Sequence, residues 1–382
     1  ELQIGGRFEM TNNYPRKNGY ALNLVTKEIL DWNPNPNSII TDIEFDKDGD
    51  RVYVAGGFST IGGAPSAQFA ALDPFSGLAD STWDLDISGQ VRDIAIHPLT
   101  DAVYLVGSFT SVAGQSREYL AGIDKDANLL PLSMDFDSDI RYVAFNDTIM
   151  YISGDFENIN GSPRYKLASI FPGGQLRKWA PENDVPFFSE FGEIKSSPNK
   201  IFLAGSFDEI NATPRKRIAA VGPVKGILDK WNPKLDGNVF SVNEIYPIGE
   251  DVFVGGSFEG ARGTPVKGLA RFDVETGIIQ KPLIRTRNVF AMESYNDQLF
   301  LAGDYDSINQ FYQPNLSAIQ FKPGKFSSKV EKVLPDQGGD NGDITLTIIG
   351  YGFQPGSKVI LRAPGVVDIV SLDSSGTVTA GR

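Results

Sequence analysis

The sequence contains no cysteine, and His97 is its single histidine in 382 residues. The absence of cysteine excludes a disulfide framework, thiolate metal sites and cysteine nucleophiles. One histidine leaves almost no material for a Ser-His-Asp triad or a multi-histidine metal site. We therefore expect no metal ion, no cofactor and no enzymatic activity.

Long apolar runs are also absent, so we expect no membrane insertion. Lys and Arg number 35 against 48 Asp and Glu, which gives a net charge of −13. This charge repels phosphate groups, and nucleic acid is not an expected partner. The chain begins at Glu1, without Met, inside an apolar segment typical of a strand. This start indicates a piece of a longer polypeptide with further domains.

Glycine and proline are plentiful, and they accompany a repeated Gly-x-Phe triplet. The 40 Gly and 23 Pro make up about a sixth of the residues, above the usual share of about 12%, which favours a turn-rich all-β chain. The third residue of the triplet is aromatic at seven positions, spaced by 50, 51, 47, 51, 51 and 47 residues: Phe8, Phe58, Phe109, Phe156, Phe207, Phe258 and Tyr305.

Each unit of about 50 residues contains four short strand-like segments. The triplet closes an apolar run such as RVYVAG or KIFLAG, a turn-rich loop follows, and an alternating run such as ITDIEF or VRDIAI ends the unit. Four antiparallel strands in a repeat of this length predict a β-propeller blade. We predict a seven-bladed β-propeller over residues 1–328, with the anchor aromatics buried between blades. The first blade lacks its inner strand, which we expect upstream residues to supply.

Residues 329–382 follow a different pattern. Strands are predicted at about Val330–Leu334, Ile344–Ile349, Lys358–Leu361 and Val367–Leu372, separated by Gly, Pro and Asp turns. This pattern indicates an immunoglobulin-like β-sandwich. The segment is much shorter than the roughly 100 residues of such a domain, so we expect it to be incomplete.

The unit G-x-F-x-x-x-x-G-x-P…(L/I)A-x-(L/I)-D…G-x-x-x-x-W-x-P, over about Glu1–Phe321, resembles the delta-60-type repeats that form β-propellers in large bacterial surface and secreted proteins. The segment VEKVLPDQGG…ITLTIIGYGFQPGSKVIL, over Val330–Leu361, resembles the start of an IPT/TIG immunoglobulin-like domain. The resemblance implies a modular binding or structural protein outside the cell or on its surface, serving adhesion or protein contact. A carbohydrate-binding protein and a propeller glycan hydrolase or lyase are the alternatives.

Candidate ligand-binding residues lie in the loops that lead from one blade to the next. Four tryptophans share one repeat position and form either aromatic platforms for a glycan or partner, or packing between blades. The loop APENDVPFFSEF adds apolar area beside two acids and is our first choice on this loop-rich face. The candidate residues are Trp32, Trp83, Trp179, Trp231, Phe187, Phe188, Glu182 and Asp184.

Three further features have a plain structural interpretation and a functional one. Acids in the blade-to-blade loops form either a solvated rim or a surface for a cation or basic partner. The run Asp46–Asp50 superficially resembles a calcium loop, but its glycine comes one position early, which favours a hairpin turn. His97 precedes Pro98 after an alternating run, which favours a turn residue over a catalyst.

Overall fold

The computed structural model describes residues 1–320 apart from 12–13, 25, 27, 133, 184–190, 282, 296–297, 310 and 313–314, and five strands between Lys329 and Ala380. The prediction of an all-β chain is confirmed. The helix in the described residues is one 3-10 turn, Ser81–Trp83. No helix in that part of the chain has the length and hydrophobicity needed to cross a membrane.

Antiparallel sheets of one strand order repeat along the chain. An inner strand pairs with a middle strand, which pairs with an outer strand. The sheets are β5 (Ile40–Phe45), β6 (Val52–Gly56), β9 (Phe69–Leu72); β10 (Val91–Ile96), β11 (Val103–Gly107), β14 (Leu120–Ile123); β15 (Ile140–Asn146), β16 (Ile149–Gly154), β19 (Leu167–Ile170); β20 (Phe191–Ser197), β21 (Lys200–Gly205), β24 (Ile218–Val221); β25 (Leu235–Ile248), β26 (Asp251–Ala261), β28 (Leu269–Asp273); and β29 (Asn288–Tyr295), β30 (Gln298–Asp304), β33 (Leu316–Gln320). Before them, within the described residues, β1 (Leu2–Gly5) and β4 (Gly19–Leu22) form a two-stranded sheet.

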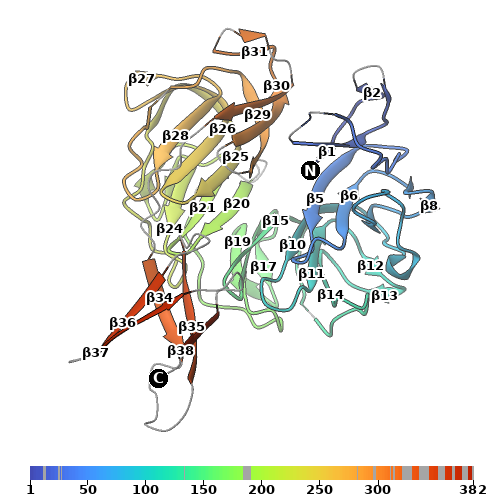
Figure 1. Ribbon diagram of the computed structural model, residues 1–382, viewed down its shortest axis with the longest axis horizontal. Helices are drawn as coiled ribbons and strands as arrows, with labels where there is room; N and C mark the ends of the chain where they lie inside the picture. The colour runs from blue at the N-terminus through green and yellow to red at the C-terminus, as the bar shows by residue number, and fades with distance from the viewer. Residues whose placement is uncertain are drawn as a thin grey trace.

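The sheets follow one another around an arc, from blue to orange in Figure 1. Consecutive inner strands pack in series from β5 through β10, β15, β20 and β25 to β29. The middle strands are the apolar runs before each triplet, and they are buried on both faces; Val52–Gly56 and Val103–Gly107 are buried throughout. Sheets with one strand order that stack side by side in this way make a β-propeller-like repeat.

The anchor aromatics are buried as predicted. Phe58, Phe109, Phe156 and Phe207 have no exposed surface, and Phe258 is 2% exposed. Their core clusters combine residues of two consecutive sheets, as where Phe109 packs with Tyr53 and Phe69 of the preceding sheet. Burial between neighbouring sheets explains why the aromatic recurs once in every unit.

A pair of backbone hydrogen bonds also fixes each triplet in place. The residue before each outer strand has positive φ, and its N–H donates to the anchor aromatic's carbonyl, while its own carbonyl accepts from the triplet's first glycine. Lys166, with φ of 65°, illustrates this with distances of 2.8 Å to Phe156 and 3.1 Å to Gly154. The same pair of bonds is made at Asn18, Gln68, Tyr119, Lys166, Arg217, Gly268 and Asn315.

Two local predictions need correction. The fourth strand of each unit is reduced to an isolated bridge, such as Leu72↔Ala79 or Ile170↔Leu176, because the segment soon turns toward the next sheet. The loop after the triplet, predicted to be rich in turns, also contains a two-stranded ribbon that was not predicted, such as β7 (Thr60–Ile61) with β8 (Ala64–Pro65). Several ribbons lie at the outer margin of the arc, as labels β8, β12, β13 and β27 show in Figure 1.

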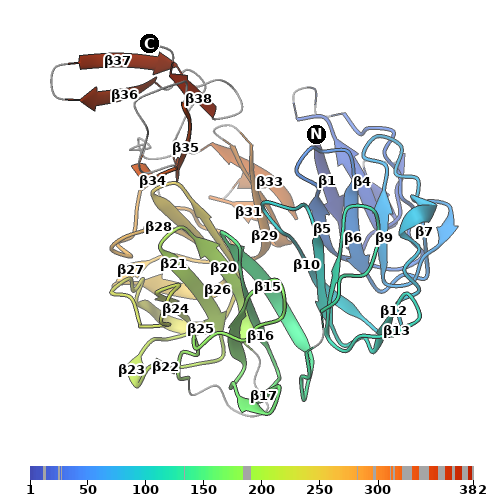
Figure 2. The same ribbon diagram turned by 90° about the horizontal axis from the view of Figure 1, so that it is seen from below.

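The C-terminal strands lie close to the predicted ranges. β34 (Lys329–Leu334), β35 (Ile344–Tyr351) and β38 (Thr377–Ala380) form one sheet, and β36 (Lys358–Ala363) pairs with β37 (Val366–Ser371). These strands, red in Figure 2, lie outside the arc of repeated sheets. The strand Thr377–Ala380 had no counterpart in the prediction.

Candidate functional site

The four tryptophans are core residues. Trp32 and Trp231 have no exposed surface, and Trp83 and Trp179 are 1% exposed. The Trp179 indole donates to the Gly222 carbonyl of the next sheet's turn at 2.9 Å and packs edge-on against Tyr151, with ring centroids 5.0 Å apart. The expectation of exposed aromatic platforms at these positions is wrong, because the indoles fill the space between consecutive sheets.

The remaining predicted residues lie in the loop of the fourth repeat. Glu182 is exposed, and its backbone N–H donates to the Asn211 Oδ1 at 2.9 Å. Asp184, Phe187 and Phe188 lie outside the described residues. A ligand on this loop therefore stays a prediction.

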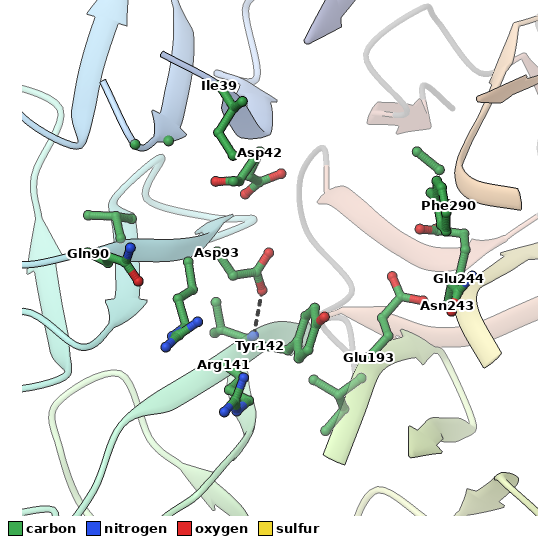
Figure 3. Close-up of a pocket in the computed structure, with 18 of the residues that line it drawn as sticks. Ile39, Asp42, Gln90, Asp93, Arg141, Tyr142, Glu193, Asn243, Glu244 and Phe290 are labelled. Atoms are coloured by element: carbon green, nitrogen blue, oxygen red, sulfur yellow. Dashed lines mark hydrogen bonds between the residues drawn. The ribbon is translucent and has the colours of Figure 1, made fainter. Parts of the chain in front are cut away.

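A pocket of about 450 Å³ lies where the inner strands begin, surrounded by β5, β10, β15, β20, β25 and β29. β5, β10, β15, β20 and β29 contribute residues near their starts, whereas the longer β25 contributes Asn243 and Glu244 from its interior, and Figure 3 shows side chains of these strands facing a common space. We call this the channel pocket. Its acidic residues are Asp42, Asp93, Glu193 and Glu244, and Tyr142 stands at the corresponding position of β15.

Three of these acids also connect neighbouring sheets. The carboxylate of Asp42 accepts a hydrogen bond from the Ile94 N–H at 2.7 Å, and Asp93 accepts one from the Val143 N–H at 2.7 Å. Glu193 accepts from Ile245 N–H at 2.5 Å. Each inner strand has a register shift near this point. Each inner strand is at the edge of its sheet, so backbone donors on its open side have no ladder partner, and the carboxylate from the preceding sheet supplies an acceptor.

A second layer of charged groups lies two residues further along the inner strands. Lys195 pairs with Glu193 at 3.0 Å. The Tyr246 hydroxyl donates to Glu293 at 2.6 Å. Glu44 occupies the corresponding place on β5. The charge of Lys195 acts on five acids, Asp42, Glu44, Asp93, Glu193 and Glu244, so acidic groups outnumber this base in the channel.

The crowding of acids raises their pKa values. Burial, with the nearby Asp42 charge second, raises the pKa of Asp93 well above its usual range. Burial raises the pKa of Glu244 in the same way, with Glu193 as the second cause. Burial also raises the pKa of Glu44 to about 8. The pKa of Lys195 lies well above its usual value, first because of the Glu193 charge, so this amine stays protonated.

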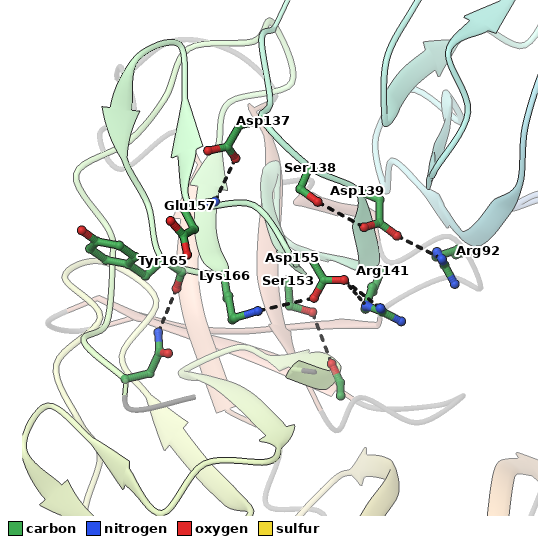
Figure 4. Close-up of polar contacts among 12 residues, drawn as sticks. Arg92, Asp137, Ser138, Asp139, Arg141, Ser153, Asp155, Glu157, Tyr165 and Lys166 are labelled. Atoms are coloured by element: carbon green, nitrogen blue, oxygen red, sulfur yellow. Dashed lines mark hydrogen bonds and ion pairs between the residues drawn. The ribbon is translucent and has the colours of Figure 1, made fainter. Parts of the chain in front are cut away.

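Two arginines at the edge of the channel pocket are paired with acids outside it. Arg92 contacts Asp139 at 3.0 Å, and Arg141 contacts Asp155 at 2.7 Å. Lys166 also reaches Asp155, at 3.4 Å (Figure 4). These guanidinium groups are held by rim carboxylates, so they do not neutralise the channel acids.

Exposed aromatic residues lie near the last two inner strands. Phe290 lines the channel pocket and is 52% exposed. Phe240, within β25, lines a different pocket with Phe258 and is 73% exposed. The Phe290 ring places an apolar contact face beside the polar groups of the channel pocket. Neither residue was among the predicted binding residues.

The acids of the channel pocket were also missed, although the sequence contains a signal for them. An acid stands at the third position of ITDIEF, VRDIAI and FGEIKS. In a propeller-like repeat, one position of the innermost strand faces the centre in every sheet, so these acids converge. Among the described residues, no group of three or more acidic or histidine side chains is placed to hold a metal ion.

Comparisons with known proteins give fold likenesses only. No protein family matches the sequence, and no curated protein matches it. The computationally designed Ika8 protein is 14% identical, with 91% of this chain and 97% of that chain covered and a TM-score of 0.46. The Neurospora crassa Pan2 WD40 domain is 11% identical, with 89% and 87% covered and a TM-score of 0.45. The extracellular domain of the hybrid two component system BT4673 from B. thetaiotaomicron is 11% identical, with 85% and 39% covered and a TM-score of 0.45.

Proposed function

We propose that this chain is a non-enzymatic binding module that receives a basic group of a partner protein in the channel pocket. The observation that carries this proposal is the convergence of Asp42, Asp93, Glu193 and Glu244 on one pocket. Lysine or arginine from a partner adds positive charge to a group of acids that Lys195 alone serves only in part. Bringing such a charge into a partly desolvated acidic pocket is favourable because each carboxylate gains a counter-charge.

The acids' raised pKa values give this proposal a distinctive pH dependence. At low pH the carboxyls are protonated, and the pocket has little charge to offer. As the pH rises through the value of about 8 for Glu44, the channel gains negative charge. Binding of a guanidinium or ammonium group therefore strengthens with rising pH as long as the ligand stays protonated.

The experiment uses tetra-arginine peptide and a tetra-glycine control, measured by isothermal titration calorimetry from pH 6 to pH 9. Wild-type protein binds tetra-arginine more tightly at pH 9 than at pH 6. The double variant Asp93→Asn with Glu244→Gln loses at least ten-fold in affinity. The matched variant Asp126→Asn, which removes an exposed acid of a distant turn, retains it. Equal binding by both variants would refute the proposal.

The architecture of the chain and the location of the protein are part of the same proposal. The repeated sheets are blades of a seven-bladed propeller, and the strands from Lys329 to Ala380 begin an IPT/TIG-like immunoglobulin domain in a modular bacterial protein that is extracellular or at the cell surface. The repeat spacing and the strand positions support this architecture. Protease protection of the native protein in intact source cells would contradict the surface location.

Carbohydrate binding is the second candidate, favoured by Phe290, which lines the polar channel pocket and is 52% exposed. An aromatic face and hydrogen-bonding carboxylates and amides together suit a sugar ring. A glycan array tests this candidate, with Phe290→Ala expected to lose binding and Phe75→Ala, an exposed phenylalanine elsewhere, expected to keep it. New reducing ends during incubation would instead favour a glycan hydrolase.

A further inference from the structure

A second pocket, of about 500 Å³, lies between the β10–β11–β14 sheet and the β15–β16–β19 sheet. It opens among the turns that follow β10, β14 and β19, whereas the channel pocket lies where the inner strands begin. Most of its lining is apolar, from Leu130, Pro131, Leu132, Pro172 and the Tyr104 ring. We call it the junction pocket.

The junction pocket exists because the repeat departs from its own pattern there. The Leu130 N–H donates to Gly122, and the equivalent bond in the next unit runs from Arg177 to Ser169. Leu130 therefore stands where the next unit has Arg177. Two residues later, Leu132 takes the place of Trp179.

At the next junction, the larger side chains occupy the corresponding space. The Arg177 guanidinium donates to the Tyr151 hydroxyl and to the Pro223 carbonyl, both at 3.3 Å. The Trp179 indole is buried and bonded to Gly222. Leu130 and Leu132 are smaller than Arg177 and Trp179, so the corresponding volume stays open in the junction pocket. The guanidinium and indole groups that fill it at the next junction are absent here.

His97 is the polar group at the base of the junction pocket, and it is 4% exposed. Its Nδ1 accepts hydrogen bonds from the backbone N–H groups of Leu99, at 3.3 Å, and Thr100, at 3.2 Å. An Nδ1 that accepts places the proton of the neutral imidazole on Nε2. Among the described residues, no hydrogen-bond acceptor is recorded for this Nε2–H.

Two other polar side chains of the pocket are already engaged. The Tyr104 hydroxyl donates to the Pro172 carbonyl at 3.3 Å. The Asp124 carboxylate accepts from the backbone of its own turn, including the Asn128 N–H at 2.8 Å. Thr100, Lys125 and Asp126 also line the pocket but are exposed, so within the described residues the Nε2–H of His97 is the donor on its buried side.

We infer that the junction pocket binds a neutral, mainly apolar small molecule that presents one carbonyl oxygen to the His97 Nε2–H. The apolar lining selects the body of the ligand, and the His97 donor selects its oxygen. A carboxylate is disfavoured because the negative charges of Asp101 and Asp147 already act on His97. The rim residues Lys125 and Asp126 carry opposite charges, so together they favour neither a cationic nor an anionic ligand.

The test compares acetophenone with ethylbenzene, which has the same size and lacks the carbonyl. Because His97 is the single histidine, its imidazole ¹⁵N signals report on the pocket without ambiguity. Acetophenone is expected to shift these signals and to bind roughly two- to ten-fold more tightly than ethylbenzene, the range of one neutral hydrogen bond. No shift at millimolar acetophenone would overturn the inference.

Variants separate the two parts of the inference. Leu132→Trp restores the residue of neighbouring units and should abolish binding of both compounds, and Leu130→Arg serves the same purpose if the first variant does not fold. His97→Asn keeps a side-chain acceptor for the turn, as Asp46 does at the equivalent place, and should remove the preference for acetophenone. Leu78→Trp, an exposed leucine on another turn, should change nothing. Unchanged binding in Leu132→Trp and Leu130→Arg would refute the site.

Discussion

The carboxylate of Asp42 accepts a hydrogen bond from the backbone N–H of Ile94, 52 residues later in the chain and 2.7 Å away. The two residues belong to inner strands of consecutive sheets, β5 and β10. The acid therefore serves two purposes, since it joins one sheet to the next and gives the channel pocket its charge. Asp93 repeats the relationship with Val143.

At Asp93, the role of the carboxylate as a hydrogen-bond acceptor can be separated from the role of its charge. Asp93→Ala leaves the buried Val143 N–H without an acceptor, so we expect unfolding free energy to fall by about 1–3 kcal/mol. Asp93→Asn keeps an acceptor oxygen and removes a charge from an acidic cluster, and it should be at least as stable as wild type at pH 7. Urea unfolding measures both. Equal losses in the two variants would contradict the backbone-acceptor role.

The crowded channel acids also predict how stability changes with pH. Glu44 has a pKa of about 8 in the folded protein, raised first by burial. Between its ordinary value and about 8, the folded state holds a proton that the unfolded state has released, so rising pH favours unfolding. The thermal midpoint should decline from pH 5 to pH 8.

Glu44→Gln tests whether titration of this channel acid causes the decline of the thermal midpoint with pH. The variant carries no titrating group at this position, and its thermal midpoint should fall less steeply with pH than that of wild type. Glu118→Gln alters an exposed acid near another loop and should leave the slope unchanged. A steeper decline in Glu44→Gln would contradict the assigned pKa direction.

Much of the fold was predictable because its signal recurs. The middle strands are apolar on both faces, and the aromatic anchor returns once per unit, so Phe109 and Phe207 indicated both strand and burial. The reduction of the fourth strand to a bridge was not predictable, because one pairing such as Ile170↔Leu176 depends on where the chain turns toward the next sheet.

The candidate site was harder to predict. Trp179 was correctly placed at a repeat position, but whether its indole faces solvent or the next sheet depends on stacking between units. Asp42 and Glu193 lie in different units, and their convergence follows from the inner strands facing one centre. The sequence shows that Leu132 replaces the tryptophan of other units. That this replacement opens a pocket is evident only once the neighbouring turn at Pro172 is in place.

The packing of an anchor aromatic has a direct energetic consequence. Phe156 is fully buried and contacts the Phe136 ring edge-on, with centroids 5.8 Å apart. Phe156→Ala should lower the unfolding free energy by about 3–5 kcal/mol, because the truncation leaves a cavity between two sheets. Phe75→Ala, at a residue 73% exposed, should change it by less than about 0.5 kcal/mol. Similar losses in both would show that the anchor is not a core residue.

The last prediction concerns two glycines with similar backbone angles and different surroundings. Gly268 has φ of 76° and Gly63 has φ of 79°, so alanine is strained at both by about 1–2 kcal/mol. A Cβ at Gly268 would lie 2.1 Å from the Arg287 carbonyl oxygen, whereas a Cβ at Gly63 would have no neighbour within 4 Å. Gly63→Ala should therefore show the backbone strain alone. Gly268→Ala should cost clearly more, because the last two sheets must separate to admit the methyl group. Urea unfolding of the two variants, with equal losses as the contradicting result, decides whether the close approach at Gly268 holds those sheets together.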